Sequence, residues 1–216
     1  MIPELRKAFC TGDGLRVIVY SSVPEGLEVA DQSVLVAGPP MSGKSDLLDA
    51  LLRSAADRHV LVSTADPVGV VRDRLADSDE LGVVDCVTRT QRVDATDTEL
   101  TKYASATSNL TEIGMKFTGL VESLDGEAVA VGVDSISEPL VYRETTAVYQ
   151  FVRTLVGQAT GAGWPTVATV STEGHDARAV EVVLEAFDVV VDTRVEDGDR
   201  QCRLRSGDET REWQGF

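Results

Sequence analysis

Residues 38–45 spell G-P-P-M-S-G-K-S and fit the pattern G-x-x-x-x-G-K-[ST]. An apolar run at residues 33–37 precedes them, and residues 46–52 repeat apolar side chains at helical spacing. The loop therefore falls between a buried strand and a helix N-terminus, where backbone N–H groups and the helix dipole attract an anion. This context predicts a P-loop that binds the phosphates of a nucleotide. The residues that would form it are Gly38, Pro39, Pro40, Met41, Ser42, Gly43, Lys44 and Ser45.

A carboxylate for a bound metal ion is expected further along the chain. In a P-loop, the lysine, here Lys44, reaches the β- and γ-phosphates, and the hydroxyl of Ser45 binds Mg²⁺. Residues 128–133 form an uninterrupted apolar run typical of a central parallel strand, and Asp134 follows at its carboxyl end. Asp134 would hold Mg²⁺ through its water shell, opposite Ser45. The alternative is an aspartate that only begins a turn.

The remaining segments alternate between strand and helix patterns. We expect strands at residues 59–63, 83–87, 166–170 and 188–193, and helices at 68–75, 110–124, 148–159 and 177–187. Residues 88–108 lack periodicity and are expected to form a surface connection, while residues 16–20 suggest a peripheral strand that a turn at 23–26 ends. This alternation predicts an α/β fold with a mostly parallel sheet, helices on both faces and a C-terminal β-hairpin within residues 202–213. No linker-like stretch divides residues 1–216, so we expect a single domain.

The amino-acid composition limits the classes of partner and the location that we expect. The chain has 36 Asp and Glu against 20 Lys and Arg, a net charge of −16, and its 43% hydrophobic content argues against disorder. Such an acidic, lysine-poor composition resembles that of salt-adapted proteins and makes non-specific nucleic-acid binding unexpected. No apolar run is long enough to cross a membrane, and the N-terminus lacks a signal-peptide core, so we expect a cytoplasmic protein. Cys10, Cys86 and Cys202 lack the spacing of a disulfide framework or zinc site, and Cys86 is expected to be buried.

Taken together, these motifs resemble the RecA/KaiC superfamily of P-loop ATPases. The likeness extends over residues 30–212 and includes D-S at 134–135, V-S-T-E at 170–173 and R-L-R-S-G at 203–207. With the acidic composition, the chain resembles the short KaiC-like paralogues of haloarchaea, a group implicated in signalling. The resemblance implies binding of ATP with Mg²⁺, ATPase activity, and assembly with copies of itself or with a protein partner.

One position departs from the family pattern. KaiC-like ATPases usually carry paired glutamates after the strand that follows the P-loop helix, and one of them polarises the attacking water. This chain has Ala65 and Asp66 there. A carboxylate shorter by one methylene can cost about 100-fold in rate. Asp66 is either a weak catalytic base or only the N-cap of a helix with Pro67 at its first position, so we expect slow or absent hydrolysis.

Two arginines near the C-terminus match the region from which KaiC-like subunits send a basic residue to a neighbour's γ-phosphate. Arg205 is the candidate for this catalytic role, and Arg203 is the alternative. Both could instead face solvent from an edge strand and deter aggregation.

Four functions remain open at this point. The first is a nucleotide-dependent signalling or assembly switch, and the second is an ATP-binding scaffold that does not hydrolyse. A DNA-acting RecA-type ATPase ranks lower, because residues 138–144 contribute only Arg143 to a basic loop. A small-molecule kinase would need an arginine-rich lid, which the sequence does not show.

Overall fold

The computed structural model describes residues 23–24, 27, 29, 32–124, 128–207 and 209–216. The strand predicted at residues 16–20 and part of the turn predicted at 23–26 lie outside the described residues.

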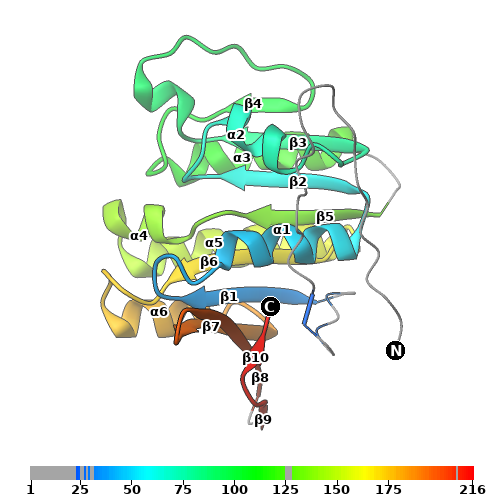
Figure 1. Ribbon diagram of the computed structural model, residues 1–216. Helices are drawn as coiled ribbons and strands as arrows, with labels where there is room; N and C mark the ends of the chain where they lie inside the picture. The colour runs from blue at the N-terminus through cyan, green and yellow to red at the C-terminus, as the bar shows by residue number, and fades with distance from the viewer. Residues whose placement is uncertain (1–22, 25–26, 28, 30–31, 125–127, 208) are drawn as a thin grey trace.

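One twisted sheet runs through the described residues (Figure 1). Its order is β10-β8-β7-β1-β6-β5-β2-β3-β4, with β9 paired to β8. All neighbours from β7 to β4 are parallel, whereas β8 pairs antiparallel with β7, β9 and β10. The strands are β1 Ser33–Gly38, β2 Arg58–Ser63, β3 Glu80–Asp85, β4 Thr101–Tyr103, β5 Val129–Val133, β6 Thr166–Ser171, β7 Val189–Glu196, β8 Asp199–Ser206, β9 Glu209–Thr210 and β10 Gln214–Gly215.

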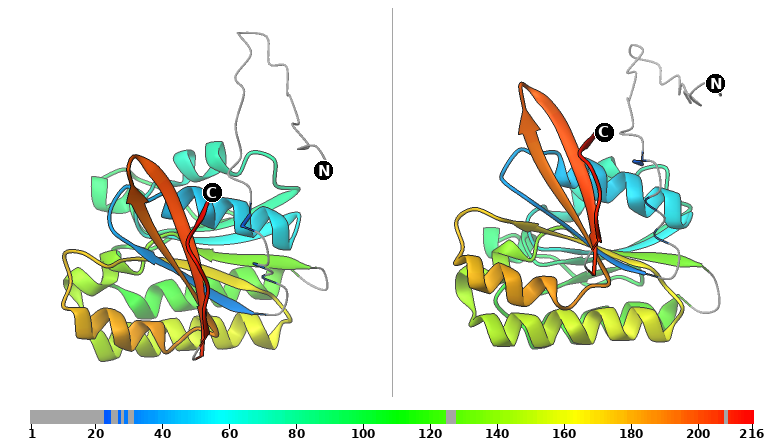
Figure 2. Two further views of the ribbon diagram at one scale, coloured as in Figure 1. Left: turned by 60° about the horizontal axis from the view of Figure 1, so that its bottom comes forward. Right: turned by 90° about the horizontal axis from the view of Figure 1, so that it is seen from below.

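Helices cover both faces of the sheet (Figure 2). On one face lie α1 Lys44–Ala55 and α2 Val68–Arg74, and on the other lie α3 Leu110–Ser123, α5 Thr145–Gly161 and α6 Ala177–Leu184. The short α4 Ser137–Tyr142 follows β5, and the 3₁₀ helix η1 Thr88–Gln91 follows β3.

Two hydrophobic cores result, because successive side chains of a strand point to opposite faces. Val34 and Val36 of β1 face the core beneath α1 and α2, whereas Leu35 and Ala37 face the core beneath α3, α5 and α6. All five residues of β5 are buried. The predicted α/β fold with a mostly parallel sheet, helices on both faces and a C-terminal β-hairpin is therefore confirmed.

Residues 88–108 differ from their predicted lack of regular structure. They contain η1 and the three-residue strand β4, which pairs with β3 at the sheet edge. A strand of three residues is too short to show a sequence period. The capped start of α3 is confirmed, because Asn109 Oδ1 accepts a hydrogen bond from the backbone N–H of Glu112 at 3.3 Å.

The start of α2 differs from the prediction as well. Pro67 occupies the N-cap position and the helix begins at Val68, so Asp66 is not the N-cap. The first N–H of the helix, that of Val68, instead donates to Asp85 Oδ2 at 2.8 Å. Asp85 lies at the end of β3 and satisfies this helix end from a neighbouring strand.

No helix within the described part of the chain is long and apolar enough to cross a membrane.

Candidate functional site

The predicted P-loop connects β1 to α1 at the carboxyl edge of the parallel strands. β1 ends at Gly38, and α1 begins at Lys44. Gly43 is the N-cap with φ 86°, a left-handed conformation that favours glycine, and no side chain caps the helix at this residue. The first-turn N–H groups of α1 therefore face the loop without a side-chain acceptor. This is the geometry in which a P-loop receives a phosphate.

Contacts from β7 support the base of the loop. The hydroxyl oxygens of Ser42 and Thr193 lie 2.7 Å apart, and both residues are buried. A Cβ atom on Gly38 would lie 2.1 Å from Thr193 Oγ1, so only glycine fits there. Met41, by contrast, is 90% exposed. The start of the loop is thus fixed to the sheet, and its tip is open to solvent.

Lys44 is held inside the loop. Its Nζ donates a hydrogen bond to the carbonyl oxygen of Pro39 at 2.5 Å. Burial lowers the pKa of Lys44, and the nearby carboxylate of Glu173, just past β6, opposes that shift. The ammonium therefore lies in a desolvated position, where attraction to a phosphate is stronger than in water.

Asp134 lies at the end of β5 and is only 4% exposed. Its Oδ1 accepts hydrogen bonds from the backbone N–H groups of Thr64 at 2.7 Å and Ala65 at 3.2 Å, and its Oδ2 contacts the hydroxyl of Ser63. Burial raises the pKa of Asp134, whereas the hydrogen bonds from Ser63 and Thr64 lower it, and the net direction is upward. The end of β2 thus forms a cradle for this carboxyl group, which the sequence did not predict.

The Ser63 hydroxyl contacts two acceptors. The Ser63 hydroxyl also donates to the carbonyl oxygen of Asp66 at 2.6 Å, and a hydroxyl has one proton to donate. Ser63 Oγ can therefore donate to Asp134 Oδ2 or to the Asp66 carbonyl, one at a time, whereas the N–H groups of Thr64 and Ala65 both donate to Asp134 Oδ1.

Ser45 and Asp134, the two predicted metal-binding residues, lie at the same edge of the sheet. β6 stands between β1 and β5, so the two residues belong to segments two strand positions apart, roughly 10 Å at the usual strand spacing. Among the described residues, no group of three or more His, Cys, Asp or Glu could hold a metal ion. Both Asp134 oxygens already accept hydrogen bonds from the end of β2, so phosphate oxygens and water would have to supply most ligands of a Mg²⁺ at Ser45 and Asp134.

The carboxylate of Asp66 is occupied by an ion pair. Arg74 Nη1 lies 2.8 Å from Asp66 Oδ2, and the same guanidinium places its Nε 3.2 Å from Oδ2 of the buried Asp49. Arg74 thus connects α1, α2 and the segment after β2. Its hold on Asp66 competes with any contact between that carboxylate and a water molecule near the P-loop.

Arg203 and Arg205 both pair with Asp192 of β7, at 3.0 Å and 2.9 Å. Arg203 also lies over the ring of Trp213, 4.5 Å from its centroid. β7 pairs with both β1 and β8, and in this register Arg205 of β8 is level with Leu35 of β1. Leu35 precedes the P-loop end of β1. β8 is paired on both sides, so the alternative of an edge strand is wrong.

The sequence profile of the Family of unknown function (DUF7504) matches residues 32–193, which include the P-loop, Asp134 and the first part of β7. The chain belongs to the DUF7504 family. No curated protein matches the sequence.

Solved structures with the same fold come from Pyrococcus horikoshii. The uncharacterized protein PH0321, solved in complex with an unknown peptide, has 15% sequence identity and a TM-score of 0.58, with 82% of this chain and 83% of that chain covered. The KaiC-like protein PH0186 of strain OT3 has 15% identity and a TM-score of 0.57, with 89% and 90% covered. At this identity the likeness concerns the fold alone. This DUF7504 member thus has the RecA-like fold of KaiC-like proteins.

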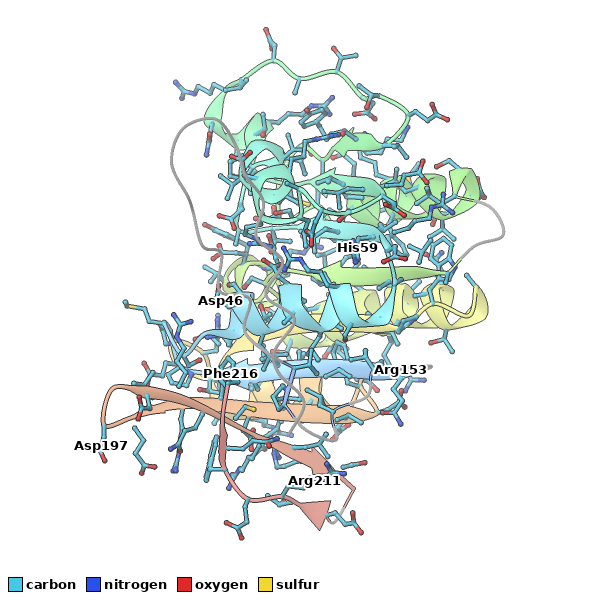
Figure 3. All side chains as sticks on the ribbon, turned by 45° about the vertical axis from the view of Figure 1, so that its right-hand side comes forward. Asp46, His59, Arg153, Asp197, Arg211 and Phe216 are labelled. Carbon is cyan, nitrogen blue, oxygen red and sulfur yellow. The ribbon has the colours of Figure 1, made fainter. Side chains whose placement is uncertain are left out.

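A contact from the C-terminal segment to the P-loop was not predicted. A Cβ atom on Gly43 would lie 2.8 Å from Arg200 Cδ and 3.0 Å from Phe216 Cζ, so both side chains pack on this glycine. Arg200 also pairs with Asp46 in the first turn of α1. Asp46 and Phe216 are labelled in Figure 3. The segment around β10 therefore supports the helix N-terminus that would receive phosphate. No local sequence signal marks this contact, because it depends on how β8 and β10 fold back.

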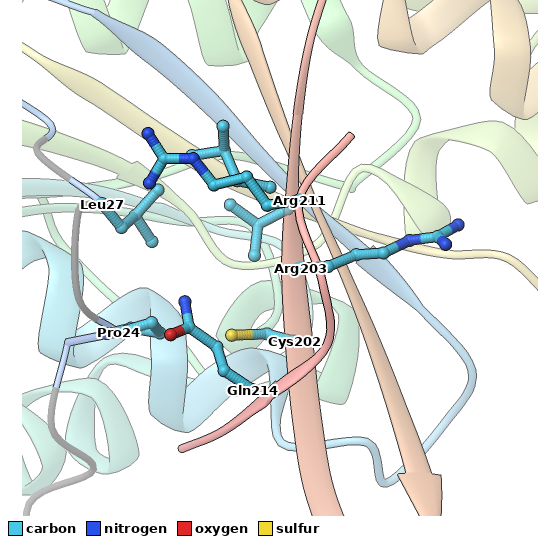
Figure 4. Close-up of a pocket in the computed structure, with 8 residues that line it drawn as sticks. Pro24, Leu27, Cys202, Arg203, Arg211 and Gln214 are labelled. Atoms are coloured by element: carbon cyan, nitrogen blue, oxygen red, sulfur yellow. The ribbon is translucent and has the colours of Figure 1, made fainter. Parts of the chain in front are cut away.

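The C-terminal segment also borders a small pocket beside β8 (Figure 4). Leu27, Cys202 and Gln214 are among the residues that line it. The pocket has no room for a water molecule, so it is too small for a ligand. Cys202 and Cys86 are both buried, as predicted for Cys86, although Cys86 lies one residue beyond β3.

Proposed function

We propose that this protein is an ATP-binding switch of the RecA/KaiC type, with slow or absent ATP hydrolysis. The observation that supports it is the P-loop geometry: a left-handed Gly43 leads directly from a buried strand into a helix N-terminus that no side chain caps. The half-buried Lys44 lies in the same loop. A triphosphate would replace Pro39 O as the partner of this ammonium.

Each residue of the site has a role in this proposal. The loop N–H groups bind phosphate oxygens, and Lys44 neutralises the terminal phosphate charge. Ser45 would hold Mg²⁺ with its hydroxyl, and Asp134 would act on it through a water molecule. The ion would supply charge neutralisation at the phosphates.

Slow hydrolysis follows from the segment after β2. Activation of water requires a carboxylate within hydrogen-bond reach of the attacking oxygen. The glutamate pair of KaiC-like ATPases is replaced by Ala65 and Asp66, and Arg74 pairs with Asp66 at 2.8 Å. ATP would then stay bound long enough to act as an effector rather than as a rapidly hydrolysed substrate.

The readout of the switch would be assembly. Bound nucleotide orders the loops that touch it and thereby changes contacts with another subunit or a protein partner. The fold neighbour PH0321 was solved with a peptide, which is compatible with a protein partner here. The same proposal includes four further expectations. Arg205 contacts the nucleotide of a neighbouring subunit, the protein is cytoplasmic, its source is a salt-adapted haloarchaeon, and residues 1–216 form a single domain.

A non-hydrolysing scaffold is the second candidate, and the Arg74–Asp66 pair favours it. The two functions differ in whether phosphate is released while ATP drives assembly. A phosphate-release assay run beside ATP-dependent size measurement separates them.

The proposal is tested by equilibrium ATP binding with Mg²⁺ in molar KCl. We expect binding in the parent protein and its loss in Lys44→Ala, because that ammonium contacts the phosphates in any P-loop. Lys102→Ala is the matched control, since the Lys102 ammonium donates to Thr98 O on the surface, in the segment before β4. Equal ATP binding by the parent and Lys44→Ala, or no binding by the parent, would reject a nucleotide site at residues 38–45.

A further inference from the structure

A cavity of about 400 Å³ opens at the carboxyl ends of β2 and β3, bordered by η1, α4 and the segment before α3. Thr64, Thr107, Ser108, Glu138 and Tyr142 are among its lining residues, and no P-loop residue belongs to it. β5 and β6 stand between β2 and β1, so the cavity lies roughly 14 Å along the sheet from the P-loop strand. The volume is within the range of small-ligand sites.

The lining combines hydroxyl groups with apolar side chains and carries one charge. Within the described part of the chain, Glu138 is the only charged side chain that lines the cavity, and no basic side chain lines it. The nearest basic residue of η1, Arg89, is turned away, because its guanidinium donates to the carbonyl oxygens of Tyr103 at 2.6 Å and Ala95 at 2.9 Å. An anion would therefore meet a carboxylate without any compensating positive charge.

Several of these lining groups have no partner inside the protein. Among the described residues, no hydrogen bond or ion pair is formed by the carboxylate of Glu138 or by the hydroxyls of Thr107, Ser108 and Tyr142. Thr64 differs, since its hydroxyl already donates to the carbonyl oxygen of Ser135. The unpaired groups offer one full negative charge, three hydroxyl oxygens and one aromatic ring.

We propose that this cavity recognises a guanidinium or ammonium group, with Glu138 as the charge partner and the ring of Tyr142 as a face for the cation. A carboxylate accepts two N–H bonds from a guanidinium, and an aromatic face attracts a cation within about 6 Å. The hydroxyls of Thr107 and Ser108 would accept the remaining N–H groups. The net charge of −16 adds a long-range attraction for cations and none for anions.

The cation could come from a free small molecule or from a basic side chain of another protein. In both cases the site recognises the same group. The cavity borders the cradle of Asp134, because Thr64 contributes both to its wall and to the hydrogen bonds on that carboxyl group.

The test is an NMR titration of the full chain without nucleotide, so its outcome does not depend on the ATP proposal. The probe is N-acetyl-arginine amide, and N-acetyl-citrulline amide is its neutral counterpart of nearly the same shape. We expect saturable shifts of the amides of Thr64 and Ser108 at millimolar probe, and binding of the citrulline compound at least about tenfold weaker. Equal binding of both compounds, or shifts spread over the surface, would overturn the proposal.

Variants assign the role of each group. Glu138→Gln should weaken the arginine probe about tenfold and abolish its preference over citrulline, because only the charge is removed. Tyr142→Phe should keep most of the affinity and Tyr142→Ala should lose it, if the ring provides the contact. Glu122→Gln, on the exposed far part of α3, is the control. Unchanged binding in Glu138→Gln would exclude this carboxylate as the partner.

The source of the cation is distinguished by a second probe. A blocked glycine-arginine-glycine peptide adds backbone on both sides of the same side chain. Binding at least about tenfold tighter than N-acetyl-arginine amide would indicate a basic side chain of another protein, and equal binding would indicate a small free cation. Failure of both probes to bind would reject the site.

Discussion

Arg74 binds Asp66 with an Nη1–Oδ2 distance of 2.8 Å. The carboxylate of Asp66, the predicted candidate for a catalytic base, is therefore engaged in an ion pair whose arginine also reaches Asp49 of α1. Replacing Ala65 and Asp66 with glutamates restores the pair that KaiC-like ATPases carry. We expect Ala65→Glu/Asp66→Glu to raise ATP turnover by about 10- to 100-fold, because the longer carboxylates reach one methylene further. Phosphate release under saturating Mg-ATP measures the change.

The control for this gain is Asp66→Ala in the parent chain. If Asp66 is not the base, its loss changes the parent rate by less than about twofold. Parent turnover of several molecules per second would contradict slow hydrolysis, and a large loss of rate in Asp66→Ala would show that Asp66 is the base.

Substitutions of Asp134 should affect the stability of the fold and the binding of Mg²⁺ to different extents. Burial raises the pKa of Asp134 and so disfavours its charged form, and Asn keeps an acceptor oxygen for the N–H groups of Thr64 and Ala65. Asp134→Asn should therefore change the free energy of unfolding by less than about 1 kcal/mol, whereas Asp134→Ala leaves buried N–H groups unpaired and should cost about 2 kcal/mol. The Asn variant loses the carboxylate charge that would act on Mg²⁺ in the proposed site.

Urea unfolding and ATP binding with and without Mg²⁺ test this difference. We expect Asp134→Asn to bind ATP equally well in both conditions, while the parent binds more tightly with Mg²⁺. A Mg²⁺ effect that survives in Asp134→Asn would remove Asp134 from the metal site.

Asp49 makes the stability depend on pH. Burial raises the pKa of Asp49 to about 6, against the opposing charge of Arg74. Because the folded-state pKa is higher than the unfolded one, the stabilisation from Asp49 is full below about pH 4 and is lost as the pH rises through about 6. Over that range the loss amounts to roughly 3 kcal/mol at most.

Asp49→Asn should remove this dependence. Relative to the parent, the variant should gain stability steadily between about pH 4 and pH 7, as measured by denaturant unfolding at each pH. Asp73→Asn, at an exposed position of α2, controls for net charge. Parallel pH profiles for the parent and Asp49→Asn would show that Asp49 does not titrate in this window.

Phe216 packs on Gly43 and so connects the C-terminal segment to the start of α1. We expect Phe216→Ala to cost about 1–2 kcal/mol, less than a fully buried phenylalanine, and to lower Tm by a few degrees. Amide exchange in the first turn of α1 should accelerate as well, because its support is removed. Val195→Ala, near the exposed end of β7, serves as the comparison, and equal exchange in both variants would argue against this support.

Arg205 is tested through assembly. If it contacts a neighbour's γ-phosphate, Arg205→Ala should weaken ATP-driven association by about tenfold while ATP binding to the monomer stays the same. Arg178→Ala, at an exposed position of α6, is the control in size measurements with and without ATP. Unchanged association and turnover in Arg205→Ala would leave this arginine with only its pairing to Asp192.

The sequence alone determined the features that depend on neighbouring residues. The glycines and lysine of the P-loop, the apolar run of β5 and the period of α5 are local patterns, and all of them occur at the predicted places. Local turn chemistry was less reliable at Asp66, where the N-cap prediction was wrong because Asp85 of β3 supplies the acceptor for the N–H of Val68.

Only the tertiary structure decided which polar groups face one another at the sheet edge. Ser63 reaches Asp134 across 71 residues, Asp85 reaches Val68 across 17, and Arg200 reaches Asp46 across 154. These contacts depend on strand order and register, which bring the strand ends together and which no single segment encodes. The sequence thus predicted a phosphate-binding loop, whereas the fold determined that the carboxylate of Asp66 is held by Arg74.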